Sequence, residues 1–232
     1  ARTSRRRPQT GCGRRWNEAR TFIREIIPGH SRMTETTDRP LVTFAVFAYN
    51  QEQYIREAVE GAFAQTYEPL EIILSDDCST DRTFEVMQEM AAAYEGPHEV
   101  KSVRRPKNLG IAFHINAVFK EGVGEYIVLA AGDDCSHPNR ASIAVDHLIR
   151  ENALLFHSDV TPVGKDLNFS FDDLALAASL DLQRIAFSNR LYIGATGAIA
   201  RGLYQKYGPI PSGNLYEDQV FGFRAALEGR VA

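Results

Sequence analysis

Between residues 41 and 150, short apolar runs alternate with segments whose apolar residues recur every three or four positions. The runs have the length of buried strands, and the periodic segments have the length and spacing of amphipathic helices. Strands are expected at residues 42–48, 70–75, 99–104 and 126–131, and helices at about 51–65, 80–94, 111–120 and 138–150. This alternation predicts an α/β fold, with a mostly parallel central sheet and helices on both faces.

Residues 1–39 differ from this pattern in composition. They hold ten arginines against four acidic residues, a net charge of +6, and because the whole chain carries −4, residues 40–232 carry −10. We interpret residues 1–39 as a basic tail, either poorly ordered or derived from vector or translated upstream sequence, and residues 40–232 as the folded domain. An alternative is a basic arm that makes a peripheral contact with an anionic membrane. The acidic balance of the folded part argues against a nucleic-acid partner.

Three features bear on the compartment. No run of 18 apolar residues exists, so no transmembrane segment is expected. The first residues lack the continuous apolar stretch of a signal peptide. Cys12, Cys78 and Cys135 are an odd, widely spaced set, which argues against a zinc site or a disulfide framework. We therefore expect a cytoplasmic protein, with a position at the inner face of the membrane as the alternative.

Polar residues or glycine follow each of the four expected strands. Loops are rich in such residues in any protein, but ligands of parallel sheets bind beyond the carboxyl ends of the strands. Their recurrence at four consecutive strand ends therefore favours a binding site. They are Tyr49 and Asn50, Asp76 and Asp77, Asn108 and Gly110, and Asp133 and Asp134.

Two pairs of adjacent carboxylates are expected to lie close together at this edge of the sheet. Such pairs repel each other unless a positive charge lies beside them. Mg²⁺ or Mn²⁺ binds one or two protein carboxylates and completes its coordination with phosphate oxygens and water. Asp76-Asp77 and Asp133-Asp134 therefore indicate a divalent cation that holds a diphosphate.

These strand ends belong to a longer ordered series of motifs. The series consists of Pro40-Leu41-Val42, Tyr49-Asn50-Gln51, Gln65-Thr66-Tyr67, Glu71-Ile72-Ile73, Ser75-Asp76-Asp77-Cys78-Ser79-Thr80-Asp81, Asn108-Leu109-Gly110, Gly124-Glu125-Tyr126-Ile127, Gly132-Asp133-Asp134, Pro138, Glu217-Asp218 and Arg224. Over about 190 residues it resembles the glycosyltransferase family 2 domain. The resemblance implies the nucleotide-diphospho-sugar transferase (GT-A) fold, a nucleotide-sugar donor with a UDP-sugar favoured, and Mn²⁺ or Mg²⁺ as cofactor.

The resemblance also implies a role for each matching position. Asp218 resembles the general base of inverting members, and Asp133 and Asp134 resemble the metal-binding carboxylates. Glu217, Gly194 and Thr196 are expected on the acceptor side. The positions expected to bind the nucleotide are Ala48, Tyr49, Asn50, Asp77, Asn108, Gly110 and Asp133.

Glu217 and Asp218 are expected just before a helix whose buried face holds Val220, Phe221, Phe223 and Leu227. Backbone N–H groups at the start of that helix would favour the ionised form of Asp218.

The implied activity is an inverting transfer of a sugar to the hydroxyl of a glycan or lipid-linked acceptor, in cell-surface polysaccharide or glycan synthesis. Two positions depart from the family pattern: Ala131-Gly132 replaces the first carboxylate of the usual Asp-x-Asp, and Ile115 replaces an arginine. The first departure leaves a catalytically silent nucleotide-sugar-binding domain as the alternative. His114 is interpreted as a half-buried helix histidine, with a contact to the diphosphate as the alternative.

Two other classes fit less well. A sugar nucleotidyltransferase would need a glycine-rich loop with arginine and lysine after the first strand, where this chain has Ala48-Tyr49-Asn50-Gln51-Glu52. A phospho-acceptor receiver domain is about half as long as this chain and needs a late lysine that the pattern does not place.

Overall fold

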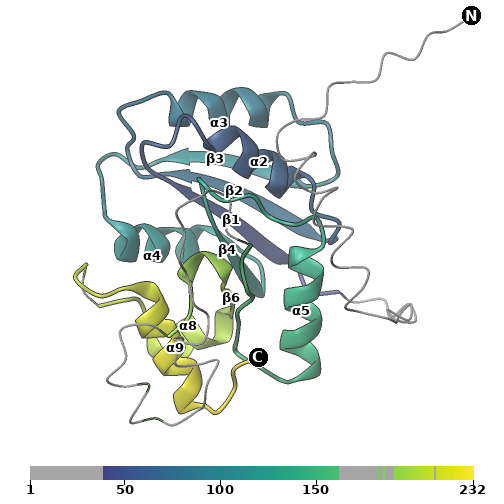
Figure 1. Ribbon diagram of the computed structural model, residues 1–232, viewed down its shortest axis with the longest axis vertical. Helices are drawn as coiled ribbons and strands as arrows, with labels where there is room; N and C mark the ends of the chain where they lie inside the picture. Colours follow the sequence, from purple (N-terminus) through teal and green to yellow (C-terminus); the bar gives the residue numbers. More distant parts are fainter. Residues whose placement is uncertain (1–38, 162–181, 183–184, 186–190, 212) are drawn as a thin grey trace, which may run out of the picture. The chain divides into compact units, whose positions relative to one another are not determined.

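The computed structural model describes residues 39–161, 182, 185, 191–211 and 213–232 (Figure 1). The chain divides into two units, residues 1–39 and 40–232, at the point where the composition also changes. Our interpretation of residues 1–38 concerns residues outside the described part, and the following paragraphs concern residues 40–232.

A six-stranded sheet with the order β3-β2-β1-β4-β6-β5 forms the centre of this unit. The first four strands in this order are parallel, whereas β6 runs antiparallel to both β4 and β5. The expected mostly parallel sheet is therefore confirmed, and the two antiparallel strands are additions that the pattern did not predict. The strands are β1 (Val42–Ala48), β2 (Leu70–Asp76), β3 (Glu99–Arg104), β4 (Tyr126–Ala131), β5 (Leu155–Phe156) and β6 (Ala198–Ala200).

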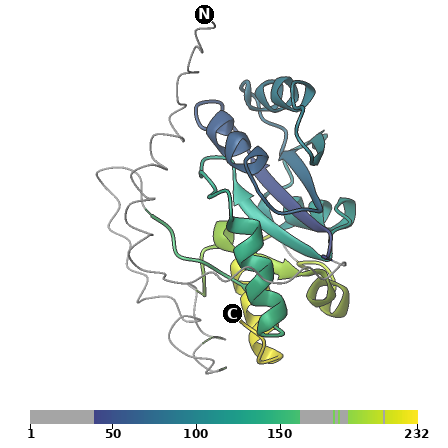
Figure 2. The same ribbon diagram turned by 90° about the vertical axis from the view of Figure 1, so that its right-hand side faces the viewer.

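Helices cover both faces of the sheet, as expected (Figures 1 and 2). Because successive side chains of a strand point to opposite faces, Phe44 and Val46 pack in one core while Ala45 and Phe47 pack in the other. The helices of the first core are α2 (Ile55–Phe63), α3 (Thr83–Ala92) and α5 (Arg140–Arg150), and those of the second are α4 (Ile111–Glu121), α8 (Arg201–Tyr207) and α9 (Glu217–Leu227). Within the described ranges, every helix falls short of what crossing a bilayer requires in length and apolarity.

Helices α2, α3 and α5 begin later than the sequence pattern suggests, and the contacts before α2 and α3 show why. The Gln51 carbonyl accepts hydrogen bonds from the amides of Tyr54 and Ile55, both at 2.9 Å, so a turn precedes α2. Ser79 does not cap α3, because its hydroxyl donates to the Asp76 carboxylate and accepts the Asn50 amide at 2.9 Å. These polar groups are used to order the loops at the end of β1 and β2, and the helices start beyond them.

The register of the parallel strands brings three strand ends to one edge. Ala48 pairs with Asp76, and Phe47 pairs with Ala131. The pattern continues into the loops, where the Asp77 amide donates to the Ala48 carbonyl at 2.9 Å and the Gly132 amide donates to the Phe47 carbonyl at 2.8 Å. The residues after β1, β2 and β4 are thus fixed next to one another by main-chain hydrogen bonds.

At the opposite edge, Glu71 of β2 is a buried carboxylate that is 1% exposed. It accepts hydrogen bonds from the Thr43 hydroxyl at 2.5 Å and from the amides of Val123 at 2.5 Å and Gly124 at 3.1 Å. Burial acts to raise the pKa of Glu71, but these hydrogen bonds outweigh it, and the pKa lies below that of an ordinary glutamate. Glu71 therefore joins β1, β2 and the start of β4 as an anion.

Glu71→Gln should lower the free energy of unfolding at pH 7 by about 2 kcal/mol, because hydrogen bonds to a charged group contribute about 1.5–3 kcal/mol. A carboxyl group whose pKa is lower in the folded state stabilises the fold at pH values above its unfolded-state pKa. This contribution is lost as the pH falls through the folded-state pKa. The difference between the two proteins should therefore shrink from pH 7 to pH 4 in urea denaturation.

Glu99→Gln is the matched control, since Glu99 is 68% exposed and pairs with Lys101 at 3.0 Å, the same lysine that lies 3.4 Å from Glu71. It should change stability by less than about 0.5 kcal/mol. Equal losses in the two variants would contradict the role of Glu71.

Candidate functional site

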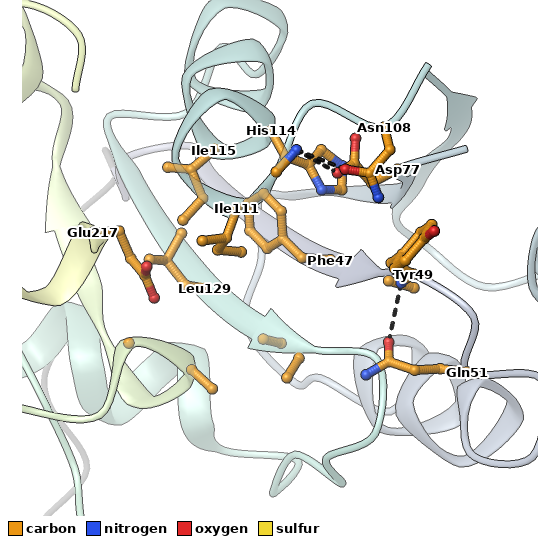
Figure 3. Close-up of a pocket in the computed structure, with 16 residues that line it drawn as sticks. Phe47, Tyr49, Gln51, Asp77, Asn108, Ile111, His114, Ile115, Leu129 and Glu217 are labelled. Atoms are coloured by element: carbon orange, nitrogen blue, oxygen red, sulfur yellow. Dashed lines mark hydrogen bonds between the residues drawn. The ribbon is translucent and has the colours of Figure 1, made fainter. Parts of the chain in front are cut away.

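A pocket of about 330 Å³ opens at the carboxyl ends of β1 and β4 (Figure 3). Its volume falls in the range of small-molecule sites. Figure 3 shows Asp77 at one end and Glu217 at the other, with Phe47 and Ile111 between them. The pocket therefore has two polar ends and an apolar floor.

The structure brings seven of the predicted site residues to this pocket and leaves five outside its lining. Those in the lining are Ala48, Tyr49, Asp77, Asn108, Gly110, Gly194 and Glu217. Those outside it are Asn50, Asp133, Asp134, Thr196 and Asp218.

Asp77 connects the end of β2 to the start of α4. One carboxylate oxygen accepts the Leu109 amide at 2.9 Å, and the other accepts the Gly110 amide at 3.0 Å. Gly110 has φ +74°, in the left-handed region that favours glycine, and its amide is also within 3.0 Å of the Asn108 side-chain oxygen. Asp77 is only 3% exposed, yet it lines the pocket and has lone pairs left for a ligand.

Asn50 and Thr196 support the walls of the pocket from outside. The Asn50 side-chain oxygen accepts the Thr80 amide at 2.8 Å, which fixes the loop after β1 to the loop after β2. Thr196 is buried in the short 3₁₀ helix η2 (Gly194–Thr196), and its hydroxyl donates to the Ile193 carbonyl at 2.7 Å. The described contacts of both side chains are therefore internal to the protein.

Asp133 and Asp134 form an exposed turn after β4, directly beyond Ala131, which lines the pocket. Partial burial and the neighbouring Asp133 carboxylate raise the pKa of Asp134, and Arg140 opposes them. Among the described residues, no group of three or more His, Cys, Asp or Glu side chains could hold a metal by itself. A pair of carboxylates fits a cation of the kind that takes its remaining ligands from phosphate and water.

Glu217 and Asp218 occupy the first turn of α9, which starts at Glu217 rather than after Asp218 as the sequence suggested. Of the predicted inward face, Phe221 is buried and Val220 and Phe223 are partly buried against the same core, whereas Leu227 is 46% exposed. Phe221 stacks on Phe119 of α4 at 5.2 Å between ring centroids. This contact holds the start of α9 beside the pocket.

The two carboxylates at the start of α9 are both half-buried. A Cβ atom at Gly194 would lie 1.9 Å from Oε1 of Glu217, so a larger residue there would require the Glu217 carboxylate to move. Burial raises the pKa of Glu217 to about 6, and the charge of Asp218 adds to the rise.

Burial also raises the pKa of Asp218, against the hydrogen bond that its carboxylate accepts from the Gln219 amide at 2.7 Å. The start of the helix therefore does favour the ionised form of Asp218, as expected, but burial has the larger effect on its pKa.

Comparison with known proteins agrees with this architecture. The sequence model of the family described as "Glycosyl transferase family 2" matches residues 43–208. The chain belongs to this family.

Among relatives of this family 2 chain, an uncharacterised protein of Mycobacterium tuberculosis is 33% identical over 189 residues, which cover 80% of this chain and 54% of the relative. The chain thus spans about half the length of that curated relative.

Two solved structures show the same GT-A fold. Residues 1–349 of TarS from S. aureus superpose with a TM-score of 0.64 at 22% identity, over 82% of this chain and 56% of that one. A mannosyltransferase from Pyrobaculum calidifontis, solved with GDP-Man and Mn²⁺, has a TM-score of 0.65 at 20% identity, over 93% of this chain and 61% of that one. TarS has also been solved with UDP-GlcNAc. The predicted GT-A fold is confirmed.

The sequence did not predict the apolar floor of the pocket, and it did not predict how deeply His114 is buried. Ile111, His114 and Ile115 line the pocket from α4, and their i, i+3, i+4 spacing was the available signal. His114 is 2% exposed, so its interpretation as half-buried was wrong. Helix α4 presents apolar residues to the core on several sides, and the sequence pattern alone did not show which of them face the ligand.

Cys135 follows the Asp133-Asp134 turn and is disulfide-bonded, whereas Cys78 is free. The argument from cysteine spacing against disulfides is therefore wrong for Cys135. The cysteines therefore do not support the expectation of a cytoplasmic protein.

Glu217→Gln should stabilise the protein at pH 7.5 by about 1–2 kcal/mol, since each pKa unit corresponds to about 1.4 kcal/mol. A raised carboxyl pKa means that the folded state binds the proton more tightly, so stability falls as the pH rises from 4.5 to about 6 and stays lower above it. The gain should vanish at pH 4. Denaturation of both proteins at the two pH values measures it.

Glu95→Gln, at an exposed carboxyl, should change stability by less than about 0.5 kcal/mol at either pH. If the gain in Glu217→Gln were the same at pH 4 as at pH 7.5, ionisation of Glu217 would not be its cause.

Proposed function

We propose that this family 2 glycosyltransferase moves a sugar from a nucleoside-diphosphate sugar, with a UDP-sugar favoured, to an acceptor hydroxyl with inversion at the anomeric carbon. The observation that carries the proposal is the continuous pocket that runs from the Asp77 carboxylate to the start of α9. Such a pocket can bind a nucleoside at one end and place the sugar near a general base at the other.

At the donor end, the nucleobase lies against Asp77 and the loop that contains Asn108 and Gly110. The floor of Phe47 and Ile111 packs against the apolar faces of base and ribose, while the partly exposed Tyr49 ring covers them. The structures of TarS with UDP-GlcNAc and of the mannosyltransferase with GDP-Man support a nucleotide sugar as the ligand class.

At the rim, Asp133 and Asp134 would hold Mn²⁺ or Mg²⁺ together with the diphosphate of the donor. A cation held by these residues would supply positive charge to the diphosphate leaving group. The mannosyltransferase complex, which contains Mn²⁺, supports this choice of cofactor.

At the acceptor end, Asp218 takes the proton of the attacking hydroxyl. Its raised pKa brings the carboxylate closer to the ideal for a general base near neutral pH. Glu217, whose carboxylate lies against Gly194, accepts hydrogen bonds from sugar hydroxyls and orients the donor. A single displacement of this kind inverts the anomeric carbon without a covalent sugar–enzyme intermediate. We propose a glycan or a lipid-linked sugar as the acceptor.

UDP with Mn²⁺ should stabilise the protein against heat much more than UDP with EDTA. At a hundredfold excess over Kd, binding contributes about 2.7 kcal/mol to the folded state. Asp134→Ala should remove the metal-dependent part, whereas Asp146→Ala, at an exposed carboxyl on α5, should retain it. Identical melting shifts with Mn²⁺ and with EDTA would refute the metal role of this pair.

Asp218→Asn keeps the shape of the side chain but cannot take a proton, so turnover should fall by roughly 10²–10⁴. UDP affinity, measured by calorimetry, should stay within about threefold of wild type. Asp146→Asn is the control and should leave turnover unchanged. Turnover of Asp218→Asn within a few-fold of wild type would reject Asp218 as the base.

A wild-type protein that binds UDP-sugars but neither transfers nor hydrolyses them would instead favour the silent binding domain. The first carboxylate of the family pattern, which is missing at Ala131-Gly132, is the feature that motivates this outcome.

A further inference from the structure

A chain of buried polar side chains leads from the interior to the pocket through His114. The His114 Nε2 atom lies 2.7 Å from the Ser75 hydroxyl oxygen, which also accepts a hydrogen bond from Arg105 Nη2 at 3.0 Å. Arg105 in turn pairs with Glu121 of the same helix as His114. Ser75, Arg105 and His114 are all buried, so this arrangement is protected from water.

The hydrogen bonds of Ser75 fix the tautomer of His114. A hydroxyl has a single proton, and because Arg105 can only donate, the one acceptor within reach of Ser75 in the described protein is the His114 ring. Ser75 therefore donates to Nε2, since the opposite arrangement would leave its own proton unpaired at a fully buried position. The proton of the neutral ring is then on Nδ1.

The ring is held in this neutral state and in one orientation. Burial is the main cause that lowers the pKa of His114 to about 4, and Arg105 adds to it against the charges of Asp77 and Glu121. The ring also meets Phe47 edge-on, with 5.2 Å between centroids and 83° between planes. At neutral pH, His114 is thus an oriented donor without a charge.

His114 Nδ1 has no hydrogen-bond partner within the described protein, yet it is not among the polar atoms sealed from solvent without a partner. His114 lines the pocket together with Asp77, and both lie at the same end of it (Figure 3). A neutral donor therefore lies beside a carboxylate acceptor at the end where the nucleobase is proposed to bind.

We propose that His114 determines base specificity: its Nδ1–H donates to a carbonyl oxygen of the nucleobase while Asp77 accepts the adjacent ring N–H. An imide such as uracil offers this pair of groups, whereas cytosine has no ring N–H in that position and presents an amino group beside it. This inference rests on the proposed function, because it requires that a nucleotide occupies the pocket.

The test compares UDP and CDP by calorimetry with Mn²⁺ present, for wild type and for His114→Phe, which keeps a ring against Phe47 but lacks the donor. Wild type should prefer UDP at least tenfold. His114→Phe should lose about tenfold in UDP affinity and keep CDP affinity within threefold, since one lost hydrogen bond costs about 1.4 kcal/mol. His147→Phe, on the surface of α5, should bind both as wild type does.

A second measurement needs no mutation. Wild type should bind either 2-thio-UDP or 4-thio-UDP several-fold more weakly than UDP, because sulfur is a poorer acceptor for Nδ1–H. Two outcomes would overturn the role of His114 and leave the proposed function intact. One is that His114→Phe binds UDP with an unchanged UDP/CDP affinity ratio, and the other is that wild type binds UDP and both thio analogues equally. A wild-type protein that binds no nucleoside diphosphate would overturn the proposed function as well.

Discussion

The parallel pairing of β1 with β2 on one side and β4 on the other is the constraint on which the site depends. Because of this pairing, the segments that follow β1, β2 and β4 leave the sheet at the same edge. Main-chain hydrogen bonds at Asp77 and Gly132 extend the alignment beyond the strands. The position of the Asp77 carboxylate and of the Asp133-Asp134 turn is thus set by backbone geometry. Side chains in these loops can change chemistry without moving the scaffold.

Strand β2 carries buried polar groups at both of its ends, and each holds a different part of the fold. Glu71 accepts the amides that precede β4, and Asp77 accepts the amides that precede α4. The loop between α4 and β4 is held a second time by Arg201, which donates to the carbonyls of Phe119, Gly122 and Gly124. The last carbonyls of a helix need such partners. The hydrogen bonds from Arg201 also fix the end of α4, the helix that supplies His114 to the pocket.

The sequence was sufficient for the layers and for the edge at which the site forms, because strand periodicity and strand-end residues are local signals. It was insufficient wherever the outcome depends on which distant element packs on a residue. Burial of His114, the inward face of α9 and the pairing of Cys135 are of this kind. Asn50, which the sequence predicted to bind the nucleotide, is another example, because its side chain orders the Thr80 loop outside the pocket lining.

Burial shifts the pKa values of His114 and Glu217, at the two ends of the pocket, in opposite directions, and in both cases it favours the uncharged form. It lowers the pKa of His114 to about 4 and raises that of Glu217 to about 6, because a low-dielectric surrounding disfavours any charged form. The exposed Asp133-Asp134 turn lies at the rim instead. In the proposed complex, the neutral forms of these two groups would contact base and sugar inside the pocket, beside the Asp77 carboxylate, and the diphosphate and its cation would lie at the wetter rim. Such a division would let the pocket desolvate the proposed donor without burying the diphosphate charge.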